Sequence, residues 1–123
     1  MNIGSLATTQ VLIVGPRHTL AQAARMMFER RSGSAVVTDD MEGPGIITER
    51  DLLRAVAEGV DLASTPVENY MTANAITASA SWDAEKAARL MLERGFRHLV
   101  VIDDRGRIEG ILSIRDLIKA LLD

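Results

Sequence analysis

Two short segments carry the residues with the clearest chemical potential, at positions 45–52 and 110–117. Both follow the pattern Gly-apolar-apolar-Thr/Ser-x-Arg-Asp-Leu, and each is expected where a β-strand runs into an α-helix. The first-turn amides of a helix are unpaired and its dipole is positive there, so such a junction attracts anions. Ser113 offers a hydroxyl, Arg115 a forked donor suited to phosphate, and Asp116 can accept hydrogen bonds from two neighbouring hydroxyls, as on a ribose. The matching residues of the first segment are Thr48, Arg50 and Asp51.

The same segments also fit a purely structural interpretation. A threonine or serine followed three residues later by an acid resembles a capping box, with Asp in place of the usual Glu or Gln. Capping is the commoner explanation for such spacing, because helix caps are frequent and ribose sites are rare. Duplication also yields two identical arrangements without any function. Spacing alone leaves both interpretations open.

The elements that position these segments are themselves repeated. Residues 23–30 align with 87–94, residues 36–37 with 100–101, and Thr8 with Thr72. The period is roughly 65 residues, longer than that of common solenoid repeats. We therefore predict two domains, at residues 1–60 and 61–123.

Hydrophobic periodicity predicts the order β-α-β-β-α in each copy, and hence a duplicated α/β fold. The expected strands are residues 11–14 and 75–77, 35–38 and 98–102, and 45–48 and 108–113. The expected helices are residues 19–31 and 83–94, and 49–58 and 114–122, with N-caps at Thr19 and Asp83. Residues 59–66 form the expected linker. Because about 60 residues bury little surface, we expect the two halves to pack together with a cleft between them.

Composition excludes several classes of protein. The chain has no cysteine, so disulfides, thiolate metal sites and a cysteine nucleophile are ruled out. A net charge of −3 and only 3% aromatic residues argue against nucleic-acid binding. No signal-like N-terminus and no membrane-spanning apolar run are present, so we expect a cytoplasmic protein without a membrane partner.

The candidate catalytic and metal-binding residues have simpler explanations. His98 has no nucleophile partner at a readable spacing, so we expect no catalytic residues and no enzyme activity. The acidic pairs at residues 39–40 and 103–104 are expected to lie in turns, each turn containing a glycine, rather than to bind a metal.

Taken in order, these features resemble the CBS domain family, named for cystathionine β-synthase. The family's opening signature is similar to Tyr70-Met71-Thr72 and, more loosely, to Leu6-Ala7-Thr8. The Gly-x-x-Thr/Ser-x-x-Asp signature occurs in both copies, and the resemblance covers residues 3–122. It implies a tandem CBS pair with pseudo-twofold symmetry, often called a Bateman module.

The resemblance also implies a ligand. Such pairs bind AMP, ADP, ATP, S-adenosylmethionine or NAD between their halves, so we expect a regulatory, energy-sensing module that requires no cofactor. By this analogy Asp51 and Asp116 hold the ribose and Thr48 and Ser113 support them. The residues implied near phosphate are Arg50, Arg115, Arg97 and His98. The adenine is expected against the first strand of the opposite half, at Ile76 and Thr77 for the first site and at Leu12 and Ile13 for the second.

The two implied sites differ in charge. The first copy has Gly33 and Ser34 where the second has Arg97 and His98. If phosphate is the anchor, the second site should bind anionic ligands better.

The implied partners are an adenosine nucleotide, a second copy of the chain, and an unidentified regulated protein. The apolar C-terminal helix, residues 117–122, is a candidate dimer interface. The alternative function is a structural or protein-interaction module whose nucleotide sites are vestigial.

Overall fold

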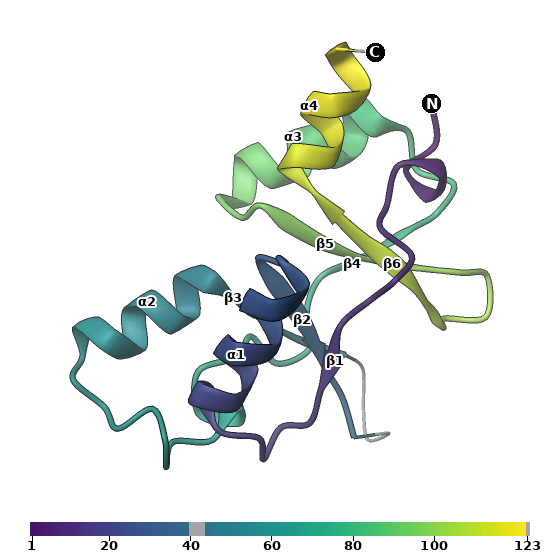
Figure 1. The fold of residues 1–123 in the computed structure, drawn as a ribbon. Helices are drawn as coiled ribbons and strands as arrows, with labels where there is room; N and C mark the ends of the chain where they lie inside the picture. The colour runs from purple at the N-terminus through teal and green to yellow at the C-terminus, as the bar shows by residue number, and fades with distance from the viewer. Residues whose placement is uncertain (40–43, 123) are drawn as a thin grey trace. The chain divides into compact units, whose positions relative to one another are not determined.

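The structure is a computed structural model that describes residues 1–39 and 44–122. It contains two three-stranded sheets with helices in the order predicted for a duplicated α/β fold (Figure 1). Asp40 of the expected acidic turn, and residues 41–43 beside it, lie outside the described residues. Within the described residues, none of the helices combines the length and apolar character needed to cross a membrane.

The chain divides into two compact units. The first unit is Leu12–Ala75, and the second unit is Met1–Val11 together with Ile76–Asp123. Residues 1–11 precede the first strand of the first repeat, but they belong to the unit that contains the sheet of the second repeat. Likewise, the residues just before Ile76 belong to the unit that contains the sheet of the first repeat. This exchange of leading segments was not foreseen from the repeat alone.

The first unit is built on a mixed sheet of order β1-β2-β3. Strand β1 runs parallel to β2, and β3 pairs antiparallel with β2 in the register Ser34↔Thr48. The elements, in chain order, are β1 (Ile13–Val14), α1 (Leu20–Arg30), β2 (Ser34–Val37), β3 (Gly45–Thr48), α2 (Glu49–Ala57) and the 3-10 turn η2 (Val67–Asn69).

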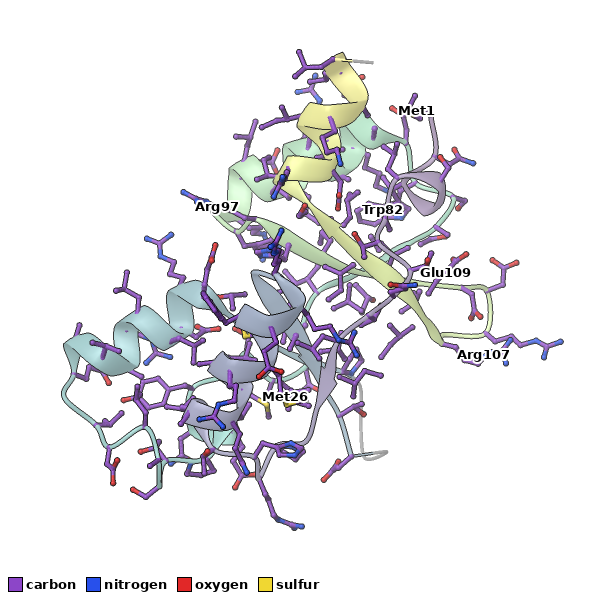
Figure 2. The ribbon with its side chains drawn as sticks, in the orientation of Figure 1. Met1, Met26, Trp82, Arg97, Arg107 and Glu109 are labelled. Carbon is purple, nitrogen blue, oxygen red and sulfur yellow. The ribbon has the colours of Figure 1, made fainter. Side chains whose placement is uncertain are left out.

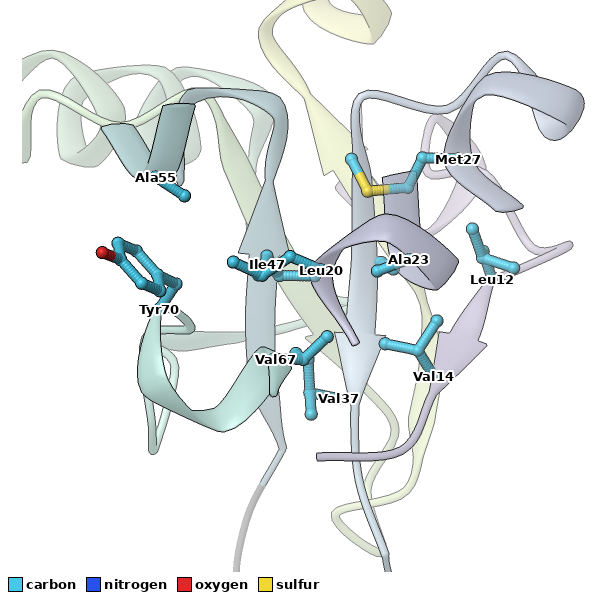
Figure 3. Packing of buried hydrophobic residues seen from close by; sticks show 11 residues of the cluster. Leu12, Val14, Leu20, Ala23, Met27, Val37, Ile47, Ala55, Val67 and Tyr70 are labelled. Atoms are coloured by element: carbon cyan, nitrogen blue, oxygen red, sulfur yellow. The ribbon is translucent and has the colours of Figure 1, made fainter. Parts of the chain in front are cut away.

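The core of this unit forms where one face of the sheet meets the helices. Side chains of alternate strand residues pack there against α1, α2 and η2 (Figure 3). The buried cluster comprises Leu12, Val14, Leu20, Ala23, Met27, Ala35, Val37, Ile47, Ala55, Val67 and Tyr70.

The second unit repeats this architecture, with sheet order β4-β5-β6. Its elements are η1 (Ile3–Ser5), β4 (Thr77–Ser79), α3 (Ala84–Arg94), β5 (His98–Ile102), β6 (Ile108–Ser113) and α4 (Ile114–Leu122). Strand β4 runs parallel to β5, and β6 pairs antiparallel with β5 in the register His98↔Ser113. The buried core comprises Ile3, Ala78, Ala87, Met91, Leu99, Val101, Leu112 and Leu117.

Local signals for the first helix of each repeat are confirmed. Thr19 caps α1 in a complete capping box with Gln22, and Asp83 accepts a hydrogen bond from the amide of Glu85 at the start of α3. Helix α1 spans Leu20–Arg30, inside the expected 19–31, because Thr19 and Arg31 are its caps.

The first strand of each repeat was predicted less well. Strand β1 begins at Ile13 rather than at residue 11, and β4 spans Thr77–Ser79 rather than 75–77. The amide of Ala75 donates to the carbonyl of Pro44 (2.9 Å), in front of β3. The chain reaches β5 only at Thr77, which pairs with Val100. The prediction failed because pairing partners, rather than β-branched composition, set where these short strands begin.

Candidate functional site

Both repeated motifs fold as closed capping boxes. In the second motif, the amide of Ser113 donates to Asp116 Oδ2 (2.8 Å), and the amide of Asp116 donates to Ser113 Oγ (3.1 Å). In the first motif, the amide of Thr48 donates to Asp51 Oδ2 (2.9 Å), and the amide of Asp51 donates to Thr48 Oγ1 (3.3 Å). Two otherwise orphaned helix donors are satisfied in each case. The capping interpretation is therefore confirmed.

Capping leaves part of the Asp116 carboxylate available. The cap uses Oδ2, and Asp116 is only partly buried. Within residues 1–39 and 44–122, no hydrogen bond or ion pair reaches its Oδ1. A carboxylate oxygen has two acceptor positions, so Oδ1 can accept hydrogen bonds from a ligand while Oδ2 holds the cap. Capping and ligand binding are thus compatible roles for one residue.

The strand register brings the predicted cations to the second motif. His98 is the ladder partner of Ser113, and the carbonyl of Arg97 accepts a hydrogen bond from the amide of Ile114 (2.9 Å). Arg97 is exposed and extends from the start of β5 (Figure 2). Arg115 is exposed in the first turn of α4. The start of α4 therefore combines a hydroxyl, a carboxylate and several cationic or imidazole groups.

The first motif occupies the same place in its own unit, but Gly33 and Ser34 stand at the positions of Arg97 and His98. Ser34 is the ladder partner of Thr48, and the carbonyl of Gly33 accepts from the amide of Glu49 (2.9 Å). Ser34 is only 3% exposed. Arg50 is exposed in the first turn of α2, at the position that Arg115 holds in the second motif. The predicted difference in charge is thus present at equivalent positions.

The strand residues expected beneath the adenine fall in both units. Leu12 and Ile13 lie in the first unit, whereas Ile76 and Thr77 lie in the second. The Leu12 side chain is part of the first unit's core, so only its backbone is available to a ligand. Ile13 and Ile76 are 51% and 40% exposed. Their association with the motif of the opposite unit remains a prediction.

The sequence did not predict that a second segment of the chain crosses each motif beside its glycine. The leading segment of one repeat pairs with the last strand of the other, with Thr8 and Ile111 exchanging two backbone hydrogen bonds (2.9 and 3.0 Å). Thr72 and Ile46 do the same in the first unit (2.9 and 3.0 Å). The alignment of Thr8 with Thr72 was the available signal.

Arg54 was also missed. Its guanidinium donates to the carbonyl of Tyr70 (3.2 Å) and lies 4.0 Å from Asp51 Oδ1. Its position three residues after Asp51 was the signal, because residues three apart on a helix are neighbours.

Among the described residues, no group of three or more His, Asp or Glu side chains is placed to hold a metal ion.

Comparison with known proteins agrees with this architecture. The sequence model described as "CBS domain" matches residues 3–58 and again residues 67–123. The chain belongs to the CBS domain family. The two matches make it a tandem CBS pair, and they indicate no catalytic family.

Relatives of this CBS pair include proteins of archaea and bacteria. An uncharacterised 17.7 kDa protein of Acidianus ambivalens is 45% identical over 122 residues, which are 98% of this chain and 73% of that protein. A CBS domain-containing protein of Bacillus subtilis is 32% identical over 111 residues, which are 89% of this chain and 78% of that protein.

A solved structure of a CBS domain protein from Pyrobaculum aerophilum superposes with a TM-score of 0.87 at 31% identity. The match covers 99% of this chain and 95% of that one. The Pyrobaculum protein was solved as a complex with AMP.

Proposed function

We propose that this CBS pair is a regulatory module that binds an adenosine nucleotide at the second motif and transmits its occupancy to a partner. The observation that carries the proposal is the grouping of Ser113, Asp116, Arg97 and His98 at the start of α4. The Oδ1 of Asp116, which the cap does not use, suits ribose hydroxyls, and the exposed guanidinium of Arg97 suits phosphate. The AMP complex of the Pyrobaculum relative supports the choice of nucleotide.

The ligand class is AMP, ADP or ATP, with NAD and S-adenosylmethionine as further candidates that share the adenosine end. Arg115 contributes a second phosphate donor, and Leu12 and Ile13 are the residues expected to supply backbone for the adenine. The module acts without a cofactor or catalysis, in the cytoplasm, as an energy sensor.

The test is a thermal-shift titration against the five nucleotides, followed by calorimetry with the best of them. A ligand at 100 times its dissociation constant should add about 2.7 kcal/mol to the free energy of unfolding. The variant Asp116→Ala combined with Arg97→Ala should abolish the shift. Asp51→Ala is the matched control, because it removes the equivalent cap and costs the same roughly 1 kcal/mol of stability.

A more specific variant replaces residues of the second repeat with those at the same positions of the first. Arg97→Gly combined with His98→Ser gives the second motif the residues of the first, and should weaken AMP binding more than adenosine binding. Equal affinity of this variant and the wild type for AMP would remove the phosphate assignment.

A second candidate function is protein interaction alone. It is favoured by the apolar side chains of α4, where Ile118, Leu121 and Leu122 are 50%, 85% and 82% exposed. A homodimer through this helix suits either function. No thermal shift with any nucleotide, together with self-association in sedimentation analysis, would favour this second function.

A further inference from the structure

The two motifs differ at Gly33 and Ser34, which replace Arg97 and His98. A second difference concerns the ion pair made by the motif aspartate. Asp116 Oδ1 has no ionic partner among the described residues, whereas Asp51 Oδ1 faces the guanidinium of Arg54 at 4.0 Å. The Asp51 side chain is 19% exposed. Because the Arg54 side chain is itself 50% exposed, a ligand hydroxyl at Oδ1 would compete with the guanidinium.

Arg54 is held in this position by three further contacts. It donates to the carbonyl of Tyr70 (3.2 Å), its guanidinium carbon lies 4.5 Å above the centre of the Tyr70 ring, and it lies 3.7 Å from Glu58 Oε2. Glu58 also accepts a hydrogen bond from the Tyr70 hydroxyl through Oε1. Tyr70 is only 7% exposed, so the ring that supports Arg54 is fixed in the core.

This arrangement differs from an ordinary surface ion pair. An isolated exposed pair contributes little, because its long side chains lose entropy to stay in one geometry. Here a planar guanidinium is stacked, hydrogen-bonded and flanked by two carboxylates, which is the setting in which arginine is preferred over lysine. We call Arg54, Tyr70 and Glu58 the arginine clamp.

The described residues around the second motif form no equivalent clamp. Lys119 occupies the position of Arg54, three residues after Asp116, and Leu6 occupies the position of Tyr70 in the aligned signatures. A lysine has neither the planar fork nor the stacking face of a guanidinium, and leucine offers no ring. No ion pair joins Lys119 to Asp116 in the part of the chain that the structure describes.

We propose that the arginine clamp closes the first motif to nucleotides, by engaging the Asp51 oxygen that would otherwise accept ribose hydroxyls. Arg54 is thus the specificity-determining residue that makes this chain a one-nucleotide module. The inference rests on the proposed function, since it assumes that the motif aspartate receives the ribose. The first motif already lacks cations at Gly33 and Ser34. The arginine clamp is a second reason, steric and electrostatic, for the first motif to bind nucleotides less well than the second.

The experiment is isothermal titration calorimetry with AMP on the whole chain. Wild type should bind about one equivalent, and Arg54→Ala about one more. The double variant Arg54→Ala with Asp51→Asn should return to one equivalent, because the asparagine amide lacks the carboxylate. Arg54→Lys is a second variant expected to open the first motif, because it keeps the charge but introduces the residue type of Lys119, which holds the equivalent position. With two such variants, misfolding of one does not decide the result. A merely structural role for Arg54 would lower stability without adding a site.

The outcomes separate the two proposals. One equivalent in wild type and no gain in either Arg54 variant would overturn the clamp alone. Two equivalents in wild type would also overturn it. No AMP binding by wild type or any variant would overturn both the clamp and the proposed function. Binding that appears only in the Arg54 variants, and is lost with Asp51→Asn, would support the clamp and contradict the assignment of the second motif.

Discussion

The carbonyl oxygen of Thr8 lies 2.6 Å from the position that a β-carbon on Gly110 would occupy. Thr8 belongs to the leading segment of the chain, and Gly110 lies in β6 as the first residue of the second motif. Two backbone hydrogen bonds between Thr8 and Ile111 fix this close approach. The motif glycine is therefore required for the crossing of two backbones, a role independent of any ligand.

Gly110→Ala should lower the free energy of unfolding by about 2 to 3 kcal/mol, since the added methyl group meets backbone that must shift. The measurement is urea denaturation followed by the fluorescence of Trp82, the chain's single tryptophan, which packs against the core of the second unit.

Gly45→Ala is the matched control in the first unit. Its added carbon would lie 3.0 Å from Met71 Sδ and 3.1 Å from the carbonyl oxygen of Thr72. The methionine side chain can rotate and the backbone contact is longer, so we expect a loss of about 1 kcal/mol. Because Trp82 lies in the other unit, this variant should be followed by circular dichroism. Equal losses for both variants would contradict the backbone-crossing explanation.

Arg31→Gly should stabilise the protein by roughly 0.5 kcal/mol. Arg31 ends α1 in the left-handed region (φ 53°), where a side chain is strained. Gly95 holds the aligned position after α3 (φ 73°). The gain is small because glycine also makes the unfolded chain more flexible.

The reverse change, Gly95→Ala, should cost about 1 kcal/mol. No atom lies within 4 Å of an added β-carbon there, so the loss would reflect backbone conformation alone. Thermal unfolding of both variants by calorimetry provides the measurement. A destabilised Arg31→Gly protein would argue that the arginine side chain makes a contact worth more than the strain.

Asp103→Asn should remove a pH-dependent part of the stability. The amide of Arg107 donates to the Asp103 carboxylate (2.9 Å), and with the amide of Arg105 and the Arg107 guanidinium it lowers the pKa of Asp103 from 3.8. Because the folded-state pKa is depressed, the contribution is present above the unfolded pKa. It is lost as pH falls through the folded value.

Wild type should therefore exceed Asp103→Asn in stability at neutral pH, and the difference should shrink as pH falls below about 4. Denaturant unfolding at a series of pH values measures it. Asp104→Asn, at an exposed neighbouring residue, removes the same charge and is the control. A constant difference across the series would exclude a titrating Asp103.

Glu58→Gln should lower the pKa of Tyr70. The hydrogen bond from the Tyr70 hydroxyl to Glu58, with burial and the negative charge of Glu58, raises this pKa above 10.0, and Arg54 opposes the rise. The chain has one tyrosine, so ultraviolet absorbance of tyrosinate reports this group alone. Glu93→Gln, in the second unit, should leave the titration unchanged.

The sign of the linked stability follows from the raised pKa. The interaction contributes fully below the unfolded pKa of tyrosine and is lost as pH rises through the folded value. Wild type should thus lose its advantage over Glu58→Gln only in alkaline solution. An advantage that persists above the titration of Tyr70 would show that Glu58 acts mainly through Arg54.

The sequence by itself determined the duplication, the order of elements in each repeat, the N-caps at Thr19 and Asp83, and both motif positions. These features depend on hydrophobic periodicity and on hydrogen bonds between residues two or three apart, which a linear reading can follow. The resemblance to the CBS family implied that Arg97 and His98 lie near phosphate, and the strand register pairs His98 with Ser113.

Tertiary structure alone decided which segments meet. The crossing of Thr8 over Gly110, the start of β4 at Thr77, and the contact of Arg54 with the Tyr70 carbonyl sixteen residues away all join distant parts of the chain. Such contacts depend on how the elements pack, and packing is settled by the combined volume and geometry of many side chains. In the first motif packing brings Arg54 to both Asp51 and Tyr70, whereas Lys119 and Leu6 stand at the equivalent positions of the second motif.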